Sequence, residues 1–381
     1  MSVRITKRAT QVLLAMGWQE LETTTGKPQL GTADPLPGPP TRRVTTHVIG
    51  LLVLASLLPL PSGASMASAM YDAPWGQREA LVLVVAQAGA AVVVFFWLAW
   101  KVIARTTLDR VTQRQRLLQR GAAVTCGITA MYTAATPLSA FRSSLALAVF
   151  GCVLAWLALE VCREHGIPLG TGLPATAAGR LHDWKIAANT LYACGAGAGC
   201  AMVLTLLVRW TGIEGVPVMK GDQLSALGIS GFANLGLHIV WAVAIEDVVI
   251  VAATTALLAA IRRPTREIYT LVCVLEVLFH ASMGLPAIGM ALYGVGRVWL
   301  YLRYRRLIPL MAGHAVFDLT FGPFLMLPFT YRITLVIPFT AAWWINRRLH
   351  EAAARESPPA EPSTPDTAAP HPEDCTSAQI A

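Results

Sequence analysis

Ten apolar runs, most of them near the length of a membrane-spanning helix, constrain the fold of this chain more than any other feature. They cover residues 46–69, 80–100, 121–139, 143–162, 186–208, 226–261, 268–283, 285–302, 307–326 and 328–346. A bilayer is crossed by about 20 residues of α-helix, so each run is a candidate span. The period-2 alternation of barrel strands is absent, and a bilayer accepts only helices or closed barrels. We therefore expect an all-α polytopic membrane bundle of about ten transmembrane helices with no sheet.

The distribution of charge predicts the orientation of these spans. Only 14% of the residues are charged, whereas soluble domains carry about 25%. Basic residues recur on alternate connections, in Lys101–Arg120, Arg262–Arg266, Arg303–Arg306 and Arg347–Arg348. Because cytoplasmic loops are enriched in Lys and Arg, we expect a multi-pass plasma-membrane protein with both termini cytoplasmic. The net charge is +8, and no aromatic-interleaved basic face indicates nucleic acid as a partner.

Composition divides the chain into four parts. Residues 1–44 are rich in Thr, Pro and Gly and are predicted to form a disordered basic cytoplasmic arm. Residues 45–210 are expected to hold five accessory transmembrane helices, and 211–350 the functional core. The acidic, Pro-rich segment 351–381 is predicted to be a disordered cytoplasmic tail. The run at 226–261 is long enough for a tilted helix plus a re-entrant piece.

Three of four successive core spans each carry a pair of ionisable side chains. The pairs are Glu246 and Asp247, Glu276 and His280, and His314 and Asp318. A charged side chain at the bilayer centre costs about 2.5–3.5 kcal/mol on insertion scales, so such groups are functional candidates. Counted from the flanking arginines at about 1.5 Å per residue, four of them lie roughly 12 to 24 Å from the cytoplasmic ends. We expect them to meet in a water-activating site.

A structural interpretation stands beside the functional one. Polar side chains in helical bundles commonly make interhelical hydrogen bonds, and a purely structural role for the whole set is the alternative. Arg297 also lies inside a run, where a paired or snorkelling arginine is the ordinary expectation. His238 lies eight residues before Glu246 and is rotated about 80° away from it, so we interpret it as a packing residue.

The same residues resemble the motifs of the type II CAAX prenyl proteases and bacteriocin-processing enzymes, the CPBP or abortive-infection (ABI) intramembrane proteases. The family pattern is Glu-Glu-x-x-x-Arg, then Phe-x-x-x-His, then His-x-x-x-Asn or Asp, on separate transmembrane helices. The matching stretches AIEDVVIVAA, VLEVLFHASMGLPAIG and LYLRYRRLIPLMAGHAVFD supply Glu246 with Asp247, His280, and His314 with Asp318. The resemblance covers about residues 225–346 and identifies 211–350 as a CPBP-like protease core.

The resemblance implies a role for each matched residue. Glu246 would be the general base that polarises a water, His280 would hold that water, and His314 would stabilise the oxyanion. An ionised Asp318 only accepts hydrogen bonds, so it would either stay protonated or accept from His314 and fix its tautomer.

Two positions depart from the family pattern. Val251 stands where the first motif has Arg, and Glu276 stands where the second has Phe. Arg297, on a neighbouring span, could supply the missing cation. We therefore group Arg297 with Asp247 and Glu276 as supporting residues.

The same ionisable residues also indicate which cofactor, if any, the protein would use. Glu246, His280 and His314 would be the ligands if a metal were bound, because two His and a carboxylate match hydrolytic zinc sites. The ligands come singly from separate helices, and the resemblance implies a metal-free mechanism, so no cofactor is expected and zinc is the alternative.

The leading function is an intramembrane endopeptidase acting on a peptide or protein substrate within or at the membrane. The alternatives are a catalytically impaired relative acting as scaffold or bacteriocin self-immunity factor, and a proton-coupled transporter. Against the transporter, no internal repeat pairs the two halves of the chain.

Overall fold

The computed structural model describes residues 41–57, 76–103, 113–135, 140–212 and 231–326, with isolated residues between 213 and 230 and between 340 and 351. These residues are helical or lie in turns and irregular connections, and the β pairing among them is one isolated bridge between Val218 and Gly284. The all-α class is therefore confirmed for this part of the chain. The predicted arm before residue 41, the tail after 351 and most of the run at 328–346 lie outside the described residues.

The helices follow the apolar runs. In chain order they are α3 (Thr41–Ala55), α5 (Gly76–Ile103), α6 (Gln113–Ala135), α7 (Ala140–Glu164), α8 (Ala177–Thr211), α10 (Phe232–Ala242), η2 (Val243–Ala253), α11 (Thr254–Ala260), α12 (Thr265–Phe279), η3 (Ala281–Met283), η4 (Leu285–Gly289), α13 (Met290–Tyr304) and α14 (Leu307–Met326).

Four helical segments are long and apolar enough to cross a bilayer. They are Phe141–Glu164, Ala177–Thr211, Phe232–Ala260 and Leu285–Tyr304. Ala88–Val102 and Leu307–Gly322 are shorter apolar helices. The structure thus provides four candidate membrane spans among the described residues, and the count of about ten stays a prediction.

Several helices begin earlier than the apolar pattern indicates, and two of them extend into segments that were assigned to other parts of the chain. α3 begins at Thr41, inside the range assigned to the basic arm, and α6 begins at Gln113, inside the basic connection Lys101–Arg120. The first eight residues of α6 are Gln, Arg and Leu. These residues have high helix propensity, so the helix extends beyond its apolar part.

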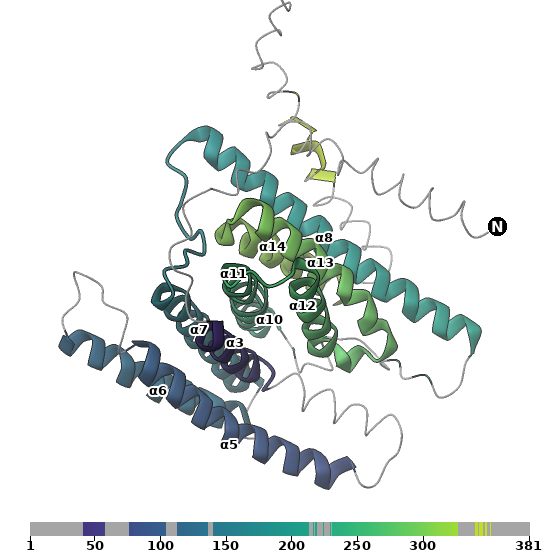
Figure 1. Ribbon diagram of the computed structural model, residues 1–381. Coiled ribbons are helices and arrows are strands. Elements are labelled where there is room, and N and C mark those ends of the chain that lie inside the picture. The colour runs from purple at the N-terminus through teal and green to yellow at the C-terminus, as the bar shows by residue number, and fades with distance from the viewer. Residues whose placement is uncertain are drawn as a thin grey trace, which may run out of the picture.

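The segment Phe232–Ala260 forms the middle of the bundle as one continuous helix, without a re-entrant turn. Its central part, η2, is π-helical, and all of its residues are buried. The Thr254 hydroxyl donates to the Val249 carbonyl at 2.9 Å, five residues back. In Figure 1, α3 and α7 lie on one side of this helix, and α8, α13 and α14 lie on the other.

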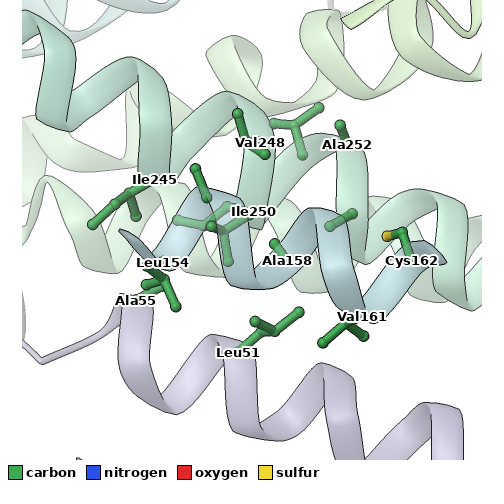
Figure 2. Close-up of a cluster of buried hydrophobic side chains, with 14 of the residues drawn as sticks. Leu51, Ala55, Leu154, Ala158, Val161, Cys162, Ile245, Val248, Ile250 and Ala252 are labelled. Atoms are coloured by element: carbon green, nitrogen blue, oxygen red, sulfur yellow. The ribbon is translucent and has the colours of Figure 1, made fainter. Parts of the chain in front are cut away.

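The contact with α3 and α7 is apolar. Figure 2 shows side chains from the three elements meeting there, namely Leu51, Ala55, Leu154, Ala158, Val161, Cys162, Ile245, Val248, Ile250 and Ala252. In lipid, such a contact is stabilised mainly by close van der Waals packing. It fixes the rotation of η2, so the acidic side chains of η2 are directed toward α13 and α14.

Glycines bring the helices around α13 close together. A Cβ on Gly197 of α8 would lie 2.5 Å from the Tyr293 Cβ, and one on Gly294 would lie 3.0 Å from the Glu276 Cγ. Small residues at such points let helix backbones approach each other in membranes. As a consequence, Tyr293 and Glu276 reach the same interior space.

Candidate active site

Arg297 of α13 is the centre of a buried charged cluster. Its guanidinium donates to Asp247 Oδ1 at 2.6 Å and to Glu246 Oε2 at 3.2 Å, and it also forms an ion pair with Glu276 Oε1. The side chain of Arg297 is fully buried. Removing ions from water costs several kcal/mol per ion, so this arrangement requires all of these contacts together.

The π-helical turn explains how two adjacent acids reach one cation. Successive side chains on an α-helix point about 100° apart. The wider turn of η2 reduces that angle, and Glu246 and Asp247 contact different nitrogens of Arg297. π-helical segments frequently occur at functional sites. The first sequence motif therefore delivers both of its acids to the cluster.

His314 of α14 joins the cluster through both ring nitrogens. Nδ1 lies 2.9 Å from Asp247 Oδ2, and Nε2 lies 3.3 Å from Asp318 Oδ2. Nε2 is also 4.0 Å from Glu246 Oε2. A carboxylate at each nitrogen suits an imidazolium, which donates from both positions.

Tyr293 is a member of the cluster that the sequence analysis missed. Its hydroxyl hydrogen-bonds to His314 Nε2, and the Arg297 guanidinium lies 3.8 Å above its ring. The signal was present, because Tyr293 lies four residues before Arg297 and so shares its helix face. Tyrosine in a transmembrane sequence is usually assigned to the membrane interface, where it is enriched.

His280 lies at the edge of the cluster and not at its centre. α12 ends at Phe279, and His280 Nδ1 lies 2.9 Å from the Glu276 carbonyl oxygen of its own last turn. Its ring is partly exposed and packs edge-on against Tyr293, with centroids 5.9 Å apart. Among the described residues, no direct contact joins it to Glu246 or His314. Glu276, four residues earlier, reaches Arg297 instead.

The other predicted residues occupy distinct places. Asp318 has a side chain 26% exposed, so it connects buried His314 to the surface of the bundle. His238 packs against Trp241, with ring centroids 5.8 Å apart, as expected of a packing residue. Val251 is fully buried in the apolar core, and Arg297 provides the cation beside Glu246.

The three residues of the zinc alternative do not all approach one another in the described part of the chain. No three His, Cys, Asp or Glu residues in the described ranges are grouped as metal ligands. Of the set Glu246, His280 and His314, only Glu246 and His314 approach each other, at 4.0 Å. Two ligands of one zinc ion lie within about 4.4 Å of each other, because each is about 2.0–2.2 Å from the metal, so His280 is the member that does not join the set. The guanidinium of Arg297 takes the carboxylate oxygens that would face such an ion.

Comparisons with protein-family models, with curated proteins and with solved structures gave no match to this chain. The resemblance to the CPBP intramembrane proteases therefore stays a prediction from the motifs.

Proposed function

We propose that the protein is an intramembrane endopeptidase of the CPBP type. The observation that carries the proposal is the approach of Glu246 Oε2 to His314 Nε2, at 4.0 Å, from two different helices. A general base must reach the proton that it abstracts, directly or through one water. At that separation one water can contact both side chains, as peptide-bond hydrolysis requires.

The surrounding residues would hold this pair in place. Arg297 fixes Glu246 and Asp247, while Asp247 and Asp318 orient the His314 ring from its two nitrogens. The contact between Asp318 and His314 supports the acceptor role for Asp318 rather than donation to an oxyanion.

The reaction would then run in two steps. Glu246 takes a proton from the water, whose oxygen attacks the peptide carbonyl. The His314 Nε2–H, which is shared with Asp318, donates to the oxyanion together with the Tyr293 hydroxyl. Collapse breaks the C–N bond, and Glu246 returns the proton to the departing amine. His280, at the partly exposed edge, would contact the substrate or the entering water.

The substrate class and location belong to the same proposal. The substrate would be a peptide or protein within or at the membrane. The enzyme would be a multi-pass plasma-membrane protein of about ten helices, with cytoplasmic termini. The four long apolar helices are compatible with a membrane protein.

A proton-coupled transporter is the second candidate, and one feature favours it. A continuous series of contacts runs from the partly exposed Asp318 through His314 and Asp247 to the buried Arg297. Chains of acidic and imidazole side chains inside membranes relay protons in pumps and transporters. The scaffold alternative rests on Val251 in place of the motif Arg.

The test compares N-terminal peptides of membrane proteins in cells that express the full chain or its variants. We expect new N-terminal peptides in cells that express the wild type. Their abundance should be about 10²- to 10⁴-fold lower with Glu246→Gln, because the amide cannot accept the proton. His314→Ala should lower the abundance of these peptides by about 10²- to 10³-fold, as the loss of an oxyanion donor does. Glu267→Gln is the matched control, because Glu267 is 48% exposed and pairs with Arg263 outside the cluster.

Asp318→Asn separates the two candidates. An amide oxygen still accepts from His314, so a peptidase should tolerate the change, whereas a relay loses a proton carrier. Two results together would favour the transporter. Proteoliposomes with the wild type would take up protons and those with Asp318→Asn would not, and the wild type would produce no new N-terminal peptides in cells. Identical termini from the wild type and Glu246→Gln would exclude the peptidase, and absence of both activities would leave the scaffold.

A further inference from the structure

A groove between α5 and α6 lies outside the candidate active site. Its volume is about 380 Å³, and its walls include Val93, Phe96, Trp97 and Ile128. In Figure 1, α3 and α7 separate this helix pair from α12 and α13. The volume falls within the range of small-molecule sites, about 300–1,000 Å³. The groove therefore has room for a ligand with an apolar body.

Cations gather at one end of this groove. Lys101, in the last turn of α5, lines it and is exposed. The Arg120 guanidinium of α6 lies 4.6 Å from the centre of the Trp100 ring, which also lines the groove. In the described part of the chain neither cation has a carboxylate partner. Arg116, one turn earlier on α6, is different because it pairs with Glu160 at 3.2 Å.

We propose that this groove binds an anionic phospholipid, with the phosphate between Lys101 and Arg120 and an acyl chain along the apolar walls. A soluble anion would not use the apolar walls, and an uncharged acyl chain would not use the cations. A phospholipid has a phosphate at one end and acyl chains at the other, which matches the cations at one end of the groove and its apolar walls. Basic pockets between membrane helices bind anionic headgroups, and Trp and Lys are common at the membrane interface.

Headgroup charge is the source of selectivity. Phosphatidylglycerol offers a phosphate without a compensating cation, whereas the phosphate of phosphatidylcholine is accompanied by its own ammonium. Each cation near an anionic membrane surface contributes binding free energy equivalent to an about fivefold lower dissociation constant. The two cations together should therefore lower the dissociation constant by about 30-fold.

Native mass spectrometry of the full chain in detergent tests the proposal, with phosphatidylglycerol and phosphatidylcholine of identical acyl chains. The wild type should bind phosphatidylglycerol more tightly, and Lys101→Gln/Arg120→Gln should weaken that binding by about 30-fold. Arg262→Gln/Arg266→Gln is the matched control, since it removes two exposed cations away from the groove and should leave binding unchanged. If the double groove variant unfolds, Lys101→Gln alone should weaken binding about fivefold.

A second arm tests the apolar part of the site. Ile128→Trp fills the groove and should weaken phosphatidylglycerol binding while both cations remain. Glycerol phosphate, which has no acyl chain, should not compete. Equal binding of the two lipids by the wild type, unchanged binding in Lys101→Gln/Arg120→Gln, or competition by glycerol phosphate would each overturn the proposal.

Discussion

Two clusters of buried acids in this bundle differ in their balance of charge. In the Arg297 cluster, one guanidinium contacts three carboxylates, those of Glu246, Asp247 and Glu276. In the cluster at the end of α7, two carboxylates are contacted by three arginines. Glu160 pairs with Arg116 and Arg163, and Glu164 pairs with Arg43.

The difference separates a structural anchor from a candidate site. At the end of α7 each acid has its own arginine. Arg163 is 46% exposed, so water still solvates part of the charge there and the desolvation penalty is smaller. Around Arg297, carboxylates outnumber cations where the side chains are almost completely buried. Such an excess of negative charge is costly inside a membrane and is characteristic of functional residues. Charge imbalance, more than burial of an acid, is therefore the distinguishing feature.

Removal of the central cation should have the largest effect. Arg297→Met leaves three carboxylates without their shared partner, and breaking a buried pair from one side costs about 3–5 kcal/mol. Arg163→Met is the matched change in the α7 cluster and should cost about 0–1 kcal/mol, because partly exposed ion pairs contribute little. Unfolding of the purified chain in mixed micelles measures both. Similar costs for the two variants would contradict the comparison.

Loss of one hydroxyl from the Arg297 cluster should have a smaller effect. Tyr293→Phe removes the hydrogen bond to His314 and should lower the free energy of unfolding by about 1 kcal/mol. The control is Tyr269→Phe on α12, which should stay within about 0.5 kcal/mol. No hydrogen bond of that hydroxyl is present among the described residues. If the two variants are equally stable in the same unfolding measurement, the Tyr293 contact contributes nothing.

The parts of the site that the sequence predicts are those set by helix periodicity. His314 and Asp318 are four residues apart, so any helix places them on one face, and they do contact each other. The chain supplies Glu246 and Asp247 together because they are adjacent. The helical runs themselves follow from apolar length, which is a local property of the sequence.

The rest depends on information that local patterns do not contain. His280 was expected beside Glu246, but α12 ends at Phe279, and the direction of a side chain beyond a helix end is not fixed by periodicity. Glu160 lies inside an apolar run, and its partner Arg116 is 44 residues away along the chain. The convergence of Glu276 and Tyr293 on Arg297 likewise requires the close packing at Gly294 and Gly197.

The smallest predicted effect tests the α7 cluster by pH. His165 follows α7, and its ring Nε2 lies 3.1 Å from His47 Nδ1, with Glu164 and Arg43 beside them. Burial, and then the charge of Arg43, lowers the pKa of His165 from 6.5. The unfolded chain then binds a proton more readily than the folded one, so stability is complete above pH about 6.5 and declines as pH falls toward the lowered pKa.

His165→Gln should flatten this decline in a series of thermal unfolding curves between about pH 5 and pH 7.5. The shift in midpoint should be smaller than that of Tyr293→Phe, because His165 is partly exposed and solvent reduces the penalty. A decline of the same slope in His165→Gln would assign the titration to another group. In that case the α7 cluster would still be balanced in charge, but its response to acid would come from a group other than His165.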